Sequence, residues 1–248
     1  MTDFQKNLDQ WVDILNKLKF DIQPIAFKYC VTKPDGLDRL DKKVAFCEMM
    51  KTAQEGKAFY ADPENHDCFP GLFVMGGDDK PVMYKSGVFG AEGEWYDEPR
   101  ACRKLYECAP MLEKDTVKYV AFSPLDKLSF EPDLLILVAK VEQTAILVRA
   151  MSYGTGKSFV SQCTPVLACA WIFNQPYLTG EMNYITTGIG IGMTRRKVVP
   201  PGLQLMSIPY DLFSTMLESL QKMPWVHPLF KPGAEEWMQQ LRTRLGIK

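Results

Sequence analysis

Cysteine offers the most distinctive chemistry in this sequence. The chain contains seven cysteines and two histidines among 248 residues. Thiolates are soft ligands that select iron–sulfur clusters, zinc or copper(I), and they are also nucleophiles. No Cys-x-x-Cys pair is present, so the spacing is unlike that of zinc ribbons or ferredoxins. Cys30 and Cys169 have apolar neighbours and are predicted to be small core residues.

Three other cysteines stand in more suggestive contexts. Cys163 directly precedes a Thr-Pro pair that predicts the start of a helix over residues 164–173, where the helix dipole favours a thiolate. Cys68 follows His66 in a Pro- and Gly-containing loop, and His66 could bind a metal, transfer protons or only hydrogen-bond the loop. Cys47 shares a predicted helix face with apolar residues and therefore points inward. The three thiols form one site if these elements meet.

A second candidate site is rich in glycine. Gly188, Gly190 and Gly192 alternate with isoleucine and are followed by Arg195. Closely spaced glycines indicate a close approach of the backbone to another group. The segment is interpreted either as a glycine-bulged strand edge packed against a helix or as a ligand loop in which Arg195 holds an anion. It lacks the spacing of a dinucleotide-binding fingerprint.

Composition narrows the function classes. The chain is 46% hydrophobic and 24% charged, with a formal net charge of -1, which predicts a globular protein with no field that attracts nucleic acid or an acidic membrane. No apolar run approaches the length of a membrane span, and no signal peptide is recognised at the N-terminus. We therefore expect a cytoplasmic protein whose odd number of thiols stays reduced.

Hydrophobic periodicity predicts the elements that position these residues. Helical spacing begins at Asp3, and short strands are expected near residues 24–30, 117–122 and 133–139, the last almost entirely apolar and hence central in a sheet. Residues 56–98 are Gly- and Pro-rich and are predicted to be mostly loop and short strand, a suitable place for a binding surface. The fold expected is one α/β or α+β domain over residues 1–248, with a mixed sheet flanked by helices.

Several short motifs occur in order along the chain: Cys47-Glu-Met-Met-Lys-Thr-Ala-Gln-Glu-Gly56, His66-Asp-Cys68-x-x-Gly71, Pro132-Asp-Leu-Leu-Ile136, Cys163, and Gly188-Ile-Gly-Ile-Gly-Met-Thr-Arg195. Their order resembles the prokaryotic family called domain of unknown function 169. The resemblance implies a cytoplasmic protein common in anaerobes, with recurring cysteines and no settled reaction. It matches Cys47, Cys68 and Cys163 to cysteines of the family. Many relatives carry a further cysteine in the Gly-rich segment, where this chain has Ile189.

Three functions follow from these observations. The leading hypothesis is an iron–sulfur protein in which Cys47, Cys68 and Cys163 bind a cluster and His66 or an exogenous ligand completes the site. An open coordination position would serve electron transfer or reductive chemistry. The partner would be a redox protein or a small molecule. Zinc bound by the same residues is an alternative.

The other two hypotheses need no metal. One is a non-catalytic binding module for an apolar or tetrapyrrole ligand, lined by the Gly-rich segments. The other is a thiol enzyme with Cys163 as nucleophile and His66 as base. The sequence does not decide whether the protein is an enzyme, and it sets neither the substrate nor the oligomeric state.

Overall fold

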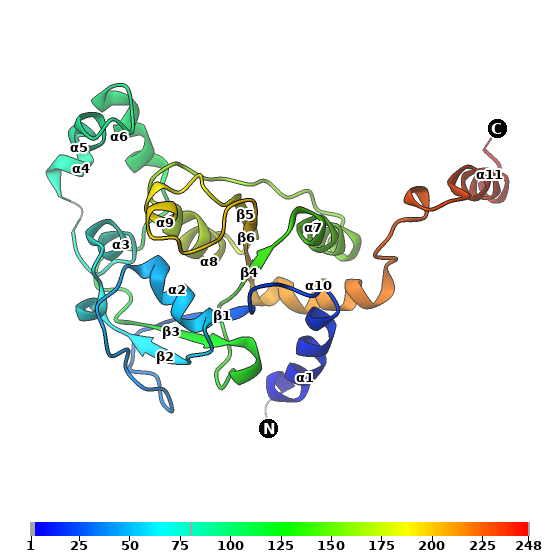
Figure 1. The fold of residues 1–248 in the computed structure, drawn as a ribbon, viewed down its shortest axis with the longest axis horizontal. Coiled ribbons are helices and arrows are strands. Elements are labelled where there is room, and N and C mark those ends of the chain that lie inside the picture. The colour runs from blue at the N-terminus through cyan, green and yellow to red at the C-terminus, as the bar shows by residue number, and fades with distance from the viewer. Residues whose placement is uncertain (1–2, 80, 248) are drawn as a thin grey trace.

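The computed structural model describes residues 3–79 and 81–247, and a six-stranded sheet lies at its centre (Figure 1). The strand order is β2-β3-β1-β4-β6-β5, and every pairing between these strands is antiparallel. The α+β class is thus confirmed, whereas the sheet is antiparallel and not mixed. The strands are β1 (Ile25–Cys30), β2 (Phe59–Ala61), β3 (Tyr119–Pro124), β4 (Leu134–Ala139), β5 (Asn183–Thr186) and β6 (Gln204–Pro209).

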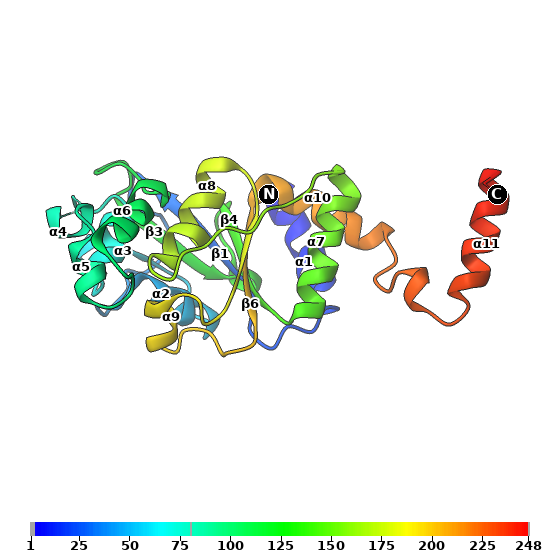
Figure 2. The same cartoon turned by 90° about the horizontal axis from the view of Figure 1, so that it is seen from above.

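Helices cover both faces of the sheet, which explains why β4 is apolar throughout. Successive residues of a strand point to opposite faces, so Leu134 and Ile136 enter one core while Leu135 and Leu137 enter the other. The second core is closed by α1 (Asp3–Asn16), α7 (Val141–Thr155) and α10 (Tyr210–Lys222), which lie together beside the sheet in Figure 2. None of the described helices is both long and apolar enough to cross a bilayer.

The first core is covered by shorter elements. These are α2 (Phe46–Gln54), α3 (Phe69–Val74), α4 (Val82–Lys85), α5 (Val88–Glu92), α6 (Pro99–Cys108), a π-helix (Ala170–Asn174), α8 (Gln175–Thr179) and α9 (Ile191–Arg195). In its described part, the predicted loop region 56–98 contains three short α-helices, a 3₁₀ helix, η1 (Pro63–Asn65), and the strand β2. Pro70 lies in the first turn of α3, and Gly87 is the N-cap of α5.

The prediction of a helix over residues 164–173 is wrong at both ends. Residues 159–164 carry no regular structure, the π-helix begins at Ala170, and α8 continues through Pro176. Side-chain hydrogen bonds explain the difference. The Asn183 amide bonds both the N–H and the C=O of Gln162, and Thr164 accepts a hydrogen bond from the indole of Trp171. These contacts hold the chain extended where local sequence favours a helix.

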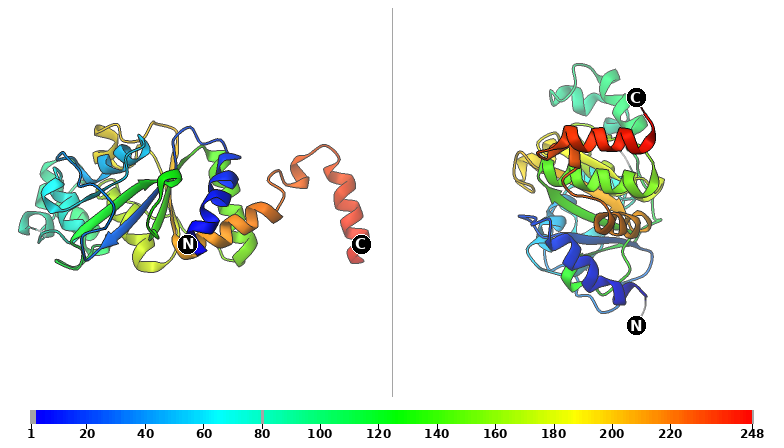
Figure 3. Two further views of the ribbon diagram at one scale, coloured as in Figure 1. Left: turned by 90° about the horizontal axis from the view of Figure 1, so that it is seen from below. Right: turned by 90° about the vertical axis from the view of Figure 1, so that its right-hand side faces the viewer.

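Residues 224–247 form an arm that leaves the body of the molecule (Figure 3). It contains a short 3₁₀ helix, η4 (Pro228–Phe230), and α11 (Ala234–Leu245). Its root is fixed, because Arg149 donates hydrogen bonds to the carbonyls of Pro224 and Trp225. No residue of α11 is buried.

Candidate functional site

A cavity of about 300 Å³ opens into the first core. It is framed by α2, α3, α4, α5, α6, α9 and the segment before the π-helix. Aromatic rings make up much of the wall, and several contact one another: the centroids of Tyr84 and Phe89 are 4.7 Å apart, and those of Phe89 and Trp95 are 5.2 Å apart. The aromatic lining residues are Phe46, Phe69, Tyr84, Phe89, Trp95 and Tyr106.

Three cysteines line this cavity, and they are Cys47, Cys68 and Cys169. Burial, with a smaller contribution from the neighbouring Cys68 thiol, raises the pKa of Cys47 to about 12. Burial also raises the pKa of Cys169 well above its ordinary value, and Cys68 and Cys47 add to that shift. Both groups are therefore neutral thiols at pH 7, since desolvation disfavours the thiolate. By exposure, Cys68 and Cys169 are both half-buried, whereas Cys47 is buried.

Charged residues line part of the cavity. Arg195 and Arg196 come from α9, and Asp67 comes from the loop before α3. The guanidinium Nε of Arg196 lies 3.4 Å from Oε2 of Glu48, which also accepts a hydrogen bond of 2.9 Å from the N–H of Ala45 at the start of α2. Arg195 is exposed and has no salt bridge to any residue that the structure describes. It is thus a cation available to a ligand.

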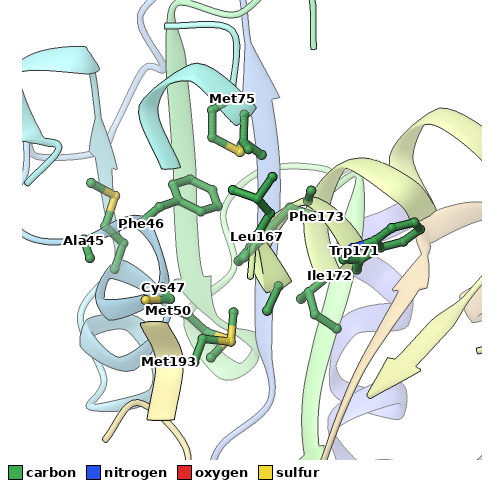
Figure 4. Packing of buried hydrophobic residues seen from close by; sticks show 14 of the residues in the cluster. Ala45, Phe46, Cys47, Met50, Met75, Leu167, Trp171, Ile172, Phe173 and Met193 are labelled. Carbon is green, nitrogen blue, oxygen red and sulfur yellow. The ribbon is translucent and has the colours of Figure 1, made fainter. Parts of the chain in front are cut away.

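The backbone is strained beside the cavity. Leu167 lines it and has a φ of 60°, a conformation that bulky side chains rarely adopt. Three residues later the chain enters the π-helix, a rare form that is frequent at functional sites. Figure 4 shows Phe46 on α2 pointing toward Leu167, and Cys47 lying beside Met193 of α9. Strained residues persist where the surrounding structure holds them, and they gather at ligand sites.

Two predicted site residues lie away from this cavity. Cys163 is half-buried, packs against the same core and donates a hydrogen bond to the carbonyl of Thr164, but it is not a lining residue. Because it does not precede a helix, no dipole favours its thiolate, and burial raises its pKa to about 11. His66 lines a separate small cavity and stacks on Phe46 with 5.6 Å between ring centroids. The structure therefore groups Cys47 and Cys68 with Cys169.

The Gly-rich segment is split between two places. Gly192 and Arg195 line the aromatic cavity, whereas Gly188 and Gly190 line a smaller neighbouring one. Gly188 lies in the turn after β5, Gly190 is the N-cap of α9, and Gly192 and Arg195 belong to α9 itself. Gly190 is needed for packing, because a Cβ there would lie 2.7 Å from that of Ala168.

Metal binding needs a compact ligand set, and the arrangement of the thiols does not supply one. Within residues 3–79 and 81–247 no group of three or more His, Cys, Asp or Glu side chains is placed to hold a metal ion. The buried thiols also favour the protonated form, which is not the ligand. The described arrangement therefore gives no support to a metal site, and iron–sulfur or zinc binding stays a prediction.

The family model DUF169, described as "Uncharacterised ArCR", matches residues 13–219. The chain belongs to the DUF169 family. This confirms the resemblance found in the motifs.

Comparison with curated proteins places the DUF169 chain beside an archaeal relative. It is 26% identical over 221 residues to "Uncharacterized protein MJ0308" of Methanocaldococcus jannaschii, a match that covers 84% of this chain and 91% of the relative. No solved structure matches the chain. The DUF169 match ends before the 224–247 arm.

The sequence reasoning missed Cys169, Arg196 and the aromatic wall. Cys169 has apolar neighbours, which is equally typical of a core residue and of an apolar cavity wall. The sequence held a partial indication of the aromatic wall, because residues 56–98 were predicted to carry a binding surface and four of the lining rings come from that region. What identifies them as a wall is their packing, which periodicity does not predict.

Proposed function

We propose that this chain is a binding protein for a small, flat, largely apolar molecule that carries a negatively charged group. The observation that carries the proposal is the aromatic-lined cavity with the unpaired Arg195 on its wall. Ligand sites are mostly apolar cavities of about 300–1,000 Å³ with a few polar groups that fix orientation. Flat rings stack on aromatic side chains, and a guanidinium binds carboxylate or sulfonate oxygens.

The volume of the cavity limits the size of the ligand. The volume of about 300 Å³ is at the lower end of the range for small-molecule sites. It suits two or three rings, whereas a tetrapyrrole macrocycle would extend beyond the walls. The neutral thiols of Cys47 and Cys169 behave here as small polarisable apolar groups.

Two fluorescent probes of similar shape test the proposal. Anilinonaphthalene sulfonate is anionic, and N-phenyl-1-naphthylamine is its neutral counterpart. We expect both to bind saturably at one site with enhanced emission. The variant Cys68→Phe fills the cavity and should abolish binding, while the matched control Cys108→Phe, at an exposed cysteine outside the cavity, should retain it. Equal binding by Cys68→Phe and the wild type would refute the site.

The charge requirement is tested separately with Arg195→Gln. This variant should weaken the sulfonate probe about fivefold and leave the neutral probe unchanged, because a half-exposed charge-assisted contact is worth about 1 kcal/mol. Arg244→Gln, on the exposed α11, is the matched control and should change neither. If both probes weaken equally in Arg195→Gln, the arginine supports the fold and does not read the anion.

The iron–sulfur protein is a second candidate, favoured by the thiols that share the cavity wall. Anaerobic purification followed by iron, sulfide and zinc analysis tests it. We expect metal loss in Cys47→Ser and Cys68→Ser, and a comparison of Cys169→Ser with Cys163→Ser shows which cysteine completes the set. Colourless protein free of iron and zinc removes this candidate.

A further inference from the structure

The arm at residues 224–247 carries an apolar surface that its own chain does not cover. Phe230 is 76% exposed and Leu245 is 60% exposed. Among the described elements α11 packs mainly on η4, and at its start Trp237 contacts His227 with 5.8 Å between ring centroids; Ala234, Met238 and Leu241 are half-buried. A helix of 12 residues is marginal in water without packing of an apolar face. The sequence therefore specifies a helix that needs a further contact surface.

The apolar residues of α11 follow a coiled-coil spacing. Ala234, Met238, Leu241 and Leu245 are separated by four, three and four residues, which is the alternation of core positions in a heptad repeat. In an antiparallel pair of such helices, the two kinds of core position face one another. Met238 then packs against Leu241 of the other helix, and Ala234 packs against Leu245. The stripe is thus complementary to a reversed copy of itself.

The charges beside the stripe have the same symmetry. Glu235 and Glu236 lie in the first turn of α11, and Arg242 and Arg244 lie in the last. In the antiparallel register just described, Glu235 of one helix lies beside Arg242 of the other, and Trp237 lies beside Arg244. The first contact is a salt bridge and the second a cation–π contact, and the two-fold axis makes each of them twice. A parallel pair would leave Glu235 without an opposite charge, because Trp237 would face Arg242 there.

We infer that the arm is a dimerisation element, in which α11 pairs antiparallel with α11 of a second copy of this chain. The root of the arm is fixed to the body by Arg149, so pairing brings two bodies to defined positions. The inference is independent of the proposed ligand site, which lies in another part of the molecule. A helix pair about 18 Å long is smaller than a standard interface, so we expect dimerisation at micromolar concentrations.

Sedimentation equilibrium at about 1–100 µM tests the inference on the full chain, the range in which a small interface associates. The wild type should convert from monomer to dimer across this range. A chain ending at Trp225 should stay monomeric and keep a cooperative thermal unfolding transition by circular dichroism, which shows that its body is folded. A monomeric wild type, including one whose arm folds onto its own body, overturns the inference. A truncated chain that still dimerises also overturns it.

Charge reversal then tests the register. Glu235→Arg places like charges beside Arg242, and Arg242→Glu places like charges beside Glu235. Each variant alone should dimerise about tenfold more weakly, since two pairs are lost and become repulsive. An equimolar mixture of the two restores both opposite-charge contacts and should recover wild-type affinity. A helix that merely fails to fold is not rescued by mixing, so unrecovered affinity overturns the antiparallel pairing.

Discussion

Burial of His66 makes a prediction that can be worked out in detail. Burial lowers the pKa of His66 from 6.5 to about 4, and the nearby Asp62 carboxylate opposes this only in part. The unfolded chain therefore binds a proton near pH 6.5, whereas the folded chain binds it only near pH 4. Since the unfolded state holds more protons between these values, stability is full above pH 6.5 and falls as the pH decreases. The loss attributable to His66 is about 2 kcal/mol at pH 5 and about 3 kcal/mol once the pH is below 4.

The variant His66→Phe isolates this contribution. It keeps the stacked ring against Phe46, where the ring planes are within 14° of one another, and it removes the titratable group. It also removes Nδ1, which is buried without a hydrogen-bond partner among the described residues. The carboxylates titrate in both proteins, so the difference between their free energies of unfolding reports the contribution of His66.

Urea unfolding followed by tryptophan fluorescence at pH 7, 6 and 5 measures the effect. We expect similar stability at pH 7 and an advantage for His66→Phe of about 2 kcal/mol at pH 5. The chain has two histidines, so the variant also assigns the His66 proton signals in an NMR titration. Parallel loss of stability in the two proteins, or a titration near pH 6.5 in the folded wild type, would refute the reasoning. It would also restore His66 as a candidate base at neutral pH.

Two further predictions concern the cavity and its wall. Iodoacetamide at pH 8 should modify Cys68 at least tenfold faster than Cys47, because the pKa of the buried Cys47 is raised to about 12. The sulfonate probe should protect Cys68 from modification. Equal rates at the two thiols, measured by peptide mass spectrometry, would show that the cavity opens readily. Gly87→Ala should lower the free energy of unfolding by about 3 kcal/mol or more, because the φ of Gly87 is 80° and a Cβ would lie 2.0 Å from the carbonyl oxygen of Pro99. Gly156→Ala, at a φ of 68° with open space around it, should lower it by about 1 kcal/mol. Similar losses for the two variants, measured by thermal or urea unfolding, would contradict the close contact at Gly87.

Local pattern predicted the elements more reliably than their ends. The apolar run at residues 133–139 was correctly expected to be central, because a strand covered on both faces needs no polar residue. The helix after Cys163 began later than predicted, since Asn183, twenty residues further along, holds that segment extended. A hydrogen bond from a distant side chain has no trace in local periodicity.

The same limit applies to the thiols. Cys47 was predicted to point inward from its helix face and Cys68 to lie in the loop region 56–98, and both line the cavity. The third thiol on the wall is Cys169 and not the predicted Cys163, because the chain turns through the strained Leu167 before the π-helix. Cys163 and Cys169 are six residues apart in the sequence, and only Cys169 lines the cavity.

The sequence by itself determined the family, and it indicated one α/β or α+β domain with an apolar central strand, because composition, motif order and hydrophobic patterning are properties of the chain read in order. Only the tertiary structure decided that the sheet is antiparallel and that aromatic rings, thiols and Arg195 enclose one cavity. These features depend on contacts between residues far apart in the sequence. Such contacts are selected by the packing of whole elements and not by the preferences of neighbouring residues.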